Sequence, residues 1–413
     1  MNNGPNTYRA VLQNTHLHQK LNFYVIARAM EFLELQDLVG AMGACRCLHY
    51  LGLPILLREM QLLFHDAEKS AVRFELYRWH LLKNPIRFSW VSSLCCSGDA
   101  LYPGESEATA RSSLSKPGYN LVDFMPYLTR LRVLDIEMHE QLLSPLVSQW
   151  IISLQGLRRL TLRHVANEVQ PILDLMAQLG HKELDAIAIS MSQSTQSVAV
   201  GPAFDPISTL SSFANSLKSL SIDWSDCRQA AVIPADMQHT YPAVQELYWN
   251  TPQCIHVGAL IRAFPGARNL RVGERALDRV MPPLYSGAIS ERVMLAQRQR
   301  NFSAQNDPGM RWASLESLHG DPLVLWILAI RCRVARLETD LRSYRSTMGH
   351  LLSALHDTTP AHLVLSLSAK DVVNLDRVFN VPSLRTLKLT VDVHDEIHVL
   401  ALLVRLFALY CTH

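Results

Sequence analysis

The stretch "LTRLRVLDIE" at residues 128–137 decides the fold, because it spaces its large aliphatic side chains in a way that recurs along the chain. The same phrase returns at residues 154–164 as "LQGLRRLTLRH". Further variants of L-x-x-L-x-L follow as far as "PSLRTLKLT" near residue 387. The central aliphatic positions of these copies are Leu134, Leu160, Ile187, Leu220, Leu247, Leu270, Leu318, Leu337 and Leu387, with the region of Leu365 filling the last interval.

The spacing of these copies predicts a repeat architecture. The first intervals run from 23 to 33 residues, close to the 20–29 residues of a leucine-rich repeat, in which a strand alternates with a helix or a looser return. One such unit cannot bury its own apolar face, whereas stacked units can. We therefore predict an α/β fold for residues 123–413, a solenoid with a curved parallel sheet and helices outside. An ordinary wound α/β domain is the alternative.

Side chains alternate between the two faces of a strand, so the repeat also predicts which residues line the concave face of the sheet. If the side chains of Leu134 and Ile136 point into the core, those of their neighbours line the concave face, and the same alternation holds in later strands. The candidate protein-binding residues on this face are Asp135, Glu137, Arg159, Arg163, Asp223, Glu246, Tyr248, Arg271 and Lys388. Tyr248 and Arg271 are the strongest candidates, because Tyr and Arg are common anchors of protein interfaces.

The segment before the repeats has a different spacing of apolar residues. Residues 16–65 carry apolar side chains at helical spacing and predict a small helical module. We expect a helix over residues 23–32, then one capped at its start by Asp37 and ended by Gly52, with Pro54 opening the next. Helices this short cannot bury all of their apolar surface against one another. We therefore expect the apolar surface that they leave unburied to contact the rest of the chain or another protein.

Polar segments separate or interrupt these regions. Residues 1–15 are expected to be disordered, and residues 66–122 to form a helical connection ending in a Ser/Gly/Pro-rich mobile loop over 97–120. A second exposed loop is predicted at residues 297–309, "QRQRNFSAQNDPG". The apolar run at 397–409 is interrupted by His398 and Arg405 and predicts an amphipathic helix rather than a membrane span.

Composition narrows the function classes. Charged residues make up 18% of the chain and the net charge is +2, so nothing predicts a nucleic-acid partner. The 8 cysteines are irregularly spaced behind a polar N-terminus, which favours reduced thiols in the cytoplasm or nucleus. We find no paired metal-ligand spacing, phosphate-binding glycine loop or nucleophile elbow. We therefore predict a non-enzyme with no catalytic residue, metal or cofactor and no membrane partner.

The front segment resembles an F-box. Members of that family share a pattern whose places are held here by Leu21, Val25, Met30, Leu33, Asp37, Leu38, Cys45, Arg46 and Leu48. The chain departs from the pattern at Leu48, where tryptophan is common, and at Asn22, where proline is usual. An F-box followed by irregular leucine-rich units is similar to the large F-box families of mushroom-forming fungi. The resemblance implies a substrate receptor of a Skp–cullin–F-box ubiquitin ligase, with an adaptor subunit, a cullin and an unknown protein substrate as partners. The expected adaptor-binding residues are Leu21, Val25, Met30, Leu33, Asp37, Leu38, Met42 and Cys45.

Two alternatives stay open at this point. The first is a non-catalytic leucine-rich-repeat scaffold whose F-box is degenerate, because Asn22 stands where the family pattern has proline. The second is an enzyme on a wound α/β fold, which would bind its ligand in a deep pocket at the carboxyl ends of the strands.

Overall fold

The computed structural model describes residues 23–62, 77, 79–97, 124–138, 145–165, 169–191, 205–224, 239–250, 256–273, 287–342, 347–368 and 375–392. Residues 1–15, the rest of the predicted 97–120 loop after residue 97, the helix expected at 397–409 and Leu21 lie outside these ranges. The chain divides into two compact units, 1–134 and 135–413.

The first elements that the structure describes in the first unit are the helices α2 (Phe23–Met30), α3 (Leu35–Ala44) and α4 (Arg46–Arg58). They meet through Met30, Leu38 and Met42, which are buried, and through Gly52 on α4. A Cβ atom at Gly52 would lie 2.4 Å from Met42 Cγ and 2.8 Å from Met30 Cε. The absence of a side chain at this position therefore lets the two methionines reach the backbone of α4.

Two predicted helix boundaries in this unit are wrong. Asp37 does not cap α3: the residue before the helix is Glu34, and Asp37 lies in the first turn, where a carboxylate still favours the positive end of the helix dipole. Gly52 and Pro54 do not separate two helices either, because α4 runs through both. The burial of Leu53, Leu56 and Leu57 on this helix offsets the hydrogen bond lost at Pro54.

The first unit also contains strands that the sequence did not predict. Strand β1 (Glu59–Leu62) continues directly from α4 and pairs in parallel with β2 (Ser93–Ser97), with Met60 opposite Leu94. The turns η2 (Pro85–Trp90) and η5 (Met125–Tyr127) are short 3-10 helices. Met60 and Leu94 are both buried. The apolar residues after Arg58 therefore alternate along a strand, where the sequence favoured a continued helix.

Strands of the second unit follow one another in chain order and pair in parallel. Strand β3 (Val133–Glu137) lies across the boundary between the units. The others are β4 (Arg159–Val165), β5 (Ala186–Met191), β6 (Ser219–Asp223), β7 (Glu246–Asn250), β8 (Asn269–Val272), β9 (Ser314–His319), β10 (Arg333–Asp340), β11 (His362–Ser368) and β12 (Thr386–Asp392). This order and direction confirm the predicted solenoid architecture.

The predicted aliphatic positions stand in register across this sheet. The row runs through Leu160, Ile187, Leu220, Leu247, Leu270, Leu318, Leu337, Leu363 and Leu387. All but the last are buried. The repeat before that of Leu387 contributes Leu363 to the row, while Leu365 lies two residues further along the same face. Each repeat thus places its central leucine on its neighbour's, which is what makes the core continuous.

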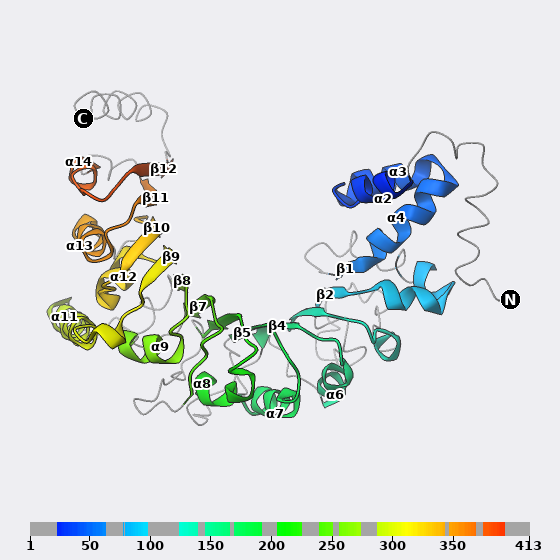
Figure 1. Ribbon diagram of the computed structural model, residues 1–413, viewed down its shortest axis with the longest axis horizontal. Coiled ribbons are helices and arrows are strands. Elements are labelled where there is room, and N and C mark those ends of the chain that lie inside the picture. Colours follow the sequence, from blue (N-terminus) through cyan, green and yellow to red (C-terminus); the bar gives the residue numbers. More distant parts are fainter. Residues whose placement is uncertain are drawn as a thin grey trace, which may run out of the picture. The chain divides into compact units, whose positions relative to one another are not determined.

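Helices occupy one face of these strands (Figure 1). They are α6 (Pro145–Ser153), α7 (Val169–Leu179), α8 (Pro206–Thr209), α9 (Val257–Ala263), α11 (Gly287–Ala304), α12 (Pro322–Leu328), α13 (Met348–Thr358) and α14 (Leu375–Phe379), with the short turns η6 (Ser211–Phe213) and η7 (Pro308–Met310). Packed helices need about 8–10 Å between axes, whereas paired strands need about 4.8 Å. The row of strands in the second unit therefore bends with its helices on the outer side.

The exposed loop predicted at residues 297–309 is wrong, because most of this segment belongs to helix α11 and the turn η7. Gln297, Asn301 and Gln305 are buried along one face, spaced four residues apart. Asn301 Nδ2 donates to the carbonyl of Ile327 at 2.9 Å, and Gln305 Nε2 donates to that of Ala329 at 2.8 Å. The segment is polar because its buried amides satisfy the backbone of the following repeat, not because it faces water.

Candidate functional site

The front helices hold the predicted adaptor-binding residues in two different environments. Val25, Leu33, Asp37 and Cys45 are exposed. Met30, Leu38 and Met42 are buried among the helices and pack the module itself. The described residues thus divide the predicted set into side chains that hold α2, α3 and α4 together and side chains that can meet another protein.

The exposed part of this module is unusually apolar. Six large hydrophobic side chains between residues 24 and 50 are exposed: Tyr24, Val25, Phe32, Leu33, Val39 and Tyr50. Phe32 is 81% exposed and Val25 57%. Single exposed hydrophobic residues are normal on any protein, but a concentration within three short helices is typical of an interaction surface.

Polar contacts hold the loop between α2 and α3 in place. Glu31 accepts from Arg58 Nη2 at 3.0 Å and also pairs with Arg28. These two guanidinium groups lower the pKa of the Glu31 carboxyl, the hydrogen bond from Arg58 having the largest effect. Glu31 precedes Phe32 and Leu33, so this cluster fixes the backbone that presents two of the exposed apolar side chains.

The residues predicted to line the face of the sheet differ in how far they are buried. Arg159, Arg163, Glu246, Arg271 and Lys388 are exposed, and Asp223 and Tyr248 are half-buried. Asp135 is half-buried and pairs with Arg163 of the next strand. Glu137, the last residue of β3, is buried, at 8% exposure. Glu137 is therefore the member of the set least open to a partner.

Three of these residues come together at the centre of the sheet. Tyr248 on β7 stands opposite Arg271 on β8, and the Arg271 guanidinium carbon lies 5.3 Å from the centre of the Tyr248 ring. Asp223 is joined to this pair through Asn250. The Nδ2 of Asn250 donates to Asp223 Oδ1 at 2.9 Å and to the Tyr248 hydroxyl at 3.3 Å. Asp223, Tyr248 and Arg271 thus form one ordered patch of both charges with an aromatic ring.

Small side chains lie beside this patch. Along the row that holds Tyr248 and Arg271, the preceding strands contribute Thr161, Ala188 and Ser221. The neighbouring row gives Ala186 and Ser219 before Glu246. A partner side chain can approach the sheet closely here and still reach Tyr248 and Arg271, an arrangement that suits protein recognition.

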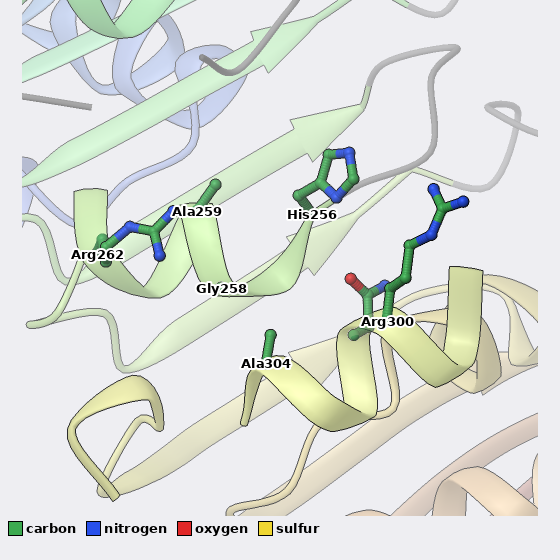
Figure 2. A pocket seen from close by; sticks show the side chains of 7 residues that line it. His256, Gly258, Ala259, Arg262, Arg300 and Ala304 are labelled. Carbon is green, nitrogen blue, oxygen red and sulfur yellow. The ribbon is translucent and has the colours of Figure 1, made fainter. Parts of the chain in front are cut away.

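A cleft on the helix side could not be predicted from the sequence pattern, because it depends on α11 being a helix. It has a volume of about 220 Å³ and lies between α9 and α11 (Figure 2). Its polar lining consists of His256, Arg262, Arg300 and Asn301. The amides at 297, 301 and 305, four residues apart, were the signal that could have revealed this buried helix face.

The described ranges show neither a metal centre nor a membrane span. No group of three or more His, Cys, Asp or Glu side chains among them is placed to hold a metal ion. None of the helices in these ranges is long and apolar enough to cross a membrane. No protein-family model matches the chain, and no curated protein matches it.

Proposed function

We propose that the protein is a non-catalytic substrate receptor of a Skp–cullin–F-box type ubiquitin ligase. The observation that carries the proposal is the front module of α2, α3 and α4, which has its own buried contacts around Met42 and Gly52 and yet exposes six large apolar side chains. A surface of this kind suits burial under the helices of an adaptor subunit. The resemblance of this segment to an F-box supports the same partner.

The sheet face of the second unit is the proposed site for the protein substrate. Tyr248 is held by Arg271 and by Asn250, which also bonds to Asp223, so little ordering is needed when a partner binds. The receptor would act by position, raising the effective concentration of a substrate lysine near a ubiquitin-charged enzyme. It would work in the cytoplasm, the nucleus or both.

The strand order argues against the enzyme alternative. Strands β4 to β12 follow one another without reversal. Wound α/β enzymes bind their ligands where the strand order reverses, in a crevice at the carboxyl ends of the strands. The described strands of the second unit have no such point, which supports a binding function for this face.

Adaptor binding is tested with the double variant Val25→Glu/Leu33→Glu in the full chain. Both side chains are exposed, so the module should stay folded while its apolar surface gains two charges. We expect pull-down with a purified adaptor–cullin complex to fall by at least about tenfold, as for loss of interface anchors. Ile86→Glu is the control, because Ile86 is also exposed, at 62%, but lies outside the three helices.

Each outcome decides between the proposal and the scaffold alternative. A wild-type chain that recovers no adaptor identifies a leucine-rich-repeat scaffold with a degenerate F-box, for which Asn22 is the sequence evidence. Equal recovery by the wild type and the double variant would reject the role assigned to Val25 and Leu33. Leu38 is unsuitable for this test, because it is only 4% exposed and a charge there would disrupt the helices themselves.

A further inference from the structure

The cleft between α9 and α11 is built on a rigid base. Asn301, 1% exposed, accepts the backbone N–H of Val257 at 3.1 Å and donates to the carbonyl of Ile327. Gly258 allows α9 to come close to α11, since a Cβ atom there would lie 3.2 Å from the Cβ of Ala304. The two helices therefore meet through small residues, and longer side chains stand around the gap.

The longer side chains at this gap are those of two arginines and a histidine. Arg262 on α9 and Arg300 on α11 line the cleft together with His256, and the described lining residues include no carboxylate. Within the described part of the chain, the side chain of Arg300 makes no hydrogen bond or ion pair, whereas that of Arg298 on the same helix is paired with Asp357 at 2.7 Å. The first amide of α9 is already bound by Asn301, so the charge of the cleft comes from side chains and not from a helix end.

These three side chains lie at two ends of the cleft. Figure 2 shows Arg262 near the end of α9 and His256 before its first turn, with Arg300 of α11 on the side of His256. Arg262 lies six positions after His256, which is roughly 9 Å along a helix at about 1.5 Å per residue. Gln297 Nε2 lies 3.5 Å from His256 Nδ1 and holds that ring beside α11.

We propose that this cleft binds an extended acidic protein segment, with one carboxylate at Arg262 and a second at Arg300 and His256. An extended chain advances about 3.3 Å per residue, so acidic side chains two or three residues apart match the separation of the two ends. A single small anion would meet only one end. The described lining residues include no Phe, Tyr or Trp on which a nucleotide base could stack.

This site is separate from both surfaces used in the proposed function. It lies between helices, whereas the substrate face is formed by the strands, and its residues do not belong to the front module. The inference therefore holds for a substrate receptor and for a repeat scaffold alike, and it predicts a second partner, or a second segment of one partner, on the helix side of the repeats.

The test uses the full chain and a fluorescein-labelled peptide of six glutamates, with six glutamines as the neutral comparison. We expect the glutamate peptide to bind and the neutral peptide not to bind. The double variant Arg262→Gln/Arg300→Gln should weaken binding by about tenfold or more, since two charge contacts are lost. Arg292→Gln is the matched control, an exposed arginine on α11 that does not line the cleft, and it should change the affinity by less than about twofold.

Three results would overturn the inference. The first is that the glutamate peptide does not bind, and the second is that it binds equally to the wild type and the double variant. The third is that inorganic phosphate alone displaces the peptide at equal concentration, which would identify a small-anion site. Adaptor pull-down with Arg262→Gln/Arg300→Gln should equal the wild type. Failure at the cleft is thereby distinguished from failure of the receptor proposal.

Discussion

The guanidinium of Arg298 donates to Asp357 Oδ2 at 2.7 Å and joins α11 to α13 across 59 residues of sequence. The pair is largely shielded from water, with side-chain exposures of 18% for Arg298 and 8% for Asp357. Arg298 also donates to the carbonyl of Trp326 and lies over its ring at 5.2 Å. One side chain thus connects three successive helices of the repeat array.

Arg298→Gln should therefore lower the free energy of unfolding by about 2–4 kcal/mol, because it removes the guanidinium that is paired with the buried side chain of Asp357. Urea denaturation followed by far-UV circular dichroism measures the effect. Arg292→Gln on the same helix is exposed and should change stability by less than about 0.5 kcal/mol. Equal stability of the two variants would show that the pair contributes nothing to the array.

Substitution by alanine should have opposite effects on stability at Gly52 and at Gly40. Gly40 lies within α3, and a Cβ atom there would meet nothing within 4 Å, so Gly40→Ala should stabilise the front helices by about 0.5–1 kcal/mol. Gly52→Ala would place its Cβ against Met42 and should destabilise them by about 1–3 kcal/mol. Hydrogen exchange of residues 23–58 reports both, and stabilisation by Gly52→Ala would contradict the packing described for α4.

Asn301 provides a third test, of the polar core of α11. Asn301→Ala leaves the N–H of Val257 and the carbonyl of Ile327 buried without this partner, which should cost about 2–4 kcal/mol. The exposed Gln299 lies two residues before it, and Gln299→Ala should be nearly neutral. The midpoint of urea unfolding distinguishes the two. An unchanged unfolding midpoint for Asn301→Ala would instead indicate that residues 297–309 form a surface segment.

These residues also show what could be read from the sequence. The row from Leu160 to Leu387 was predictable, because each repeat carries its own aliphatic pattern and the pairing of Tyr248 with Arg271 follows from the same register. Helix α11 was not predictable from composition, since Asn301 bonds to residues 44 and 26 positions away. The continuity of α4 likewise depends on methionines of two other helices, and the sequence around Gly52 and Pro54 taken alone favours a break.

The same limit applies to the candidate sites. Alternation along the strands predicted which residues share the outer face of the sheet, but the burial of Glu137 and the pairing of Asp135 with Arg163 depend on neighbouring strands. In the front helices, a helical pattern could not separate buried Met30 from exposed Val25, because both kinds of position use the same residue types. The cleft could not be predicted at all without the helix that forms one of its walls.

The buried side chain of His80 should make the stability of the first unit depend on pH. Its side chain is buried, its Nδ1 has no hydrogen-bond partner in the described part of the chain, and its ring lies beside Trp79 and His49. Burial lowers the pKa of His80 from 6.5 to about 4, and the positive charges of Arg87, His49 and Lys83 act in the same direction. The folded state therefore binds this proton more weakly than the unfolded state.

A depressed histidine pKa stabilises the folded state above the unfolded value and loses that contribution as the pH falls towards the folded value. Between about pH 7 and about pH 5, the wild type should lose about 1–2 kcal/mol more unfolding free energy than His80→Gln, which cannot titrate at this position. Hydrogen exchange of residues 79–97 in graded urea measures the difference for this segment. A parallel loss in both proteins would assign the acid sensitivity to other groups, whereas a smaller loss in His80→Gln follows only if the buried imidazole is neutral in the folded unit.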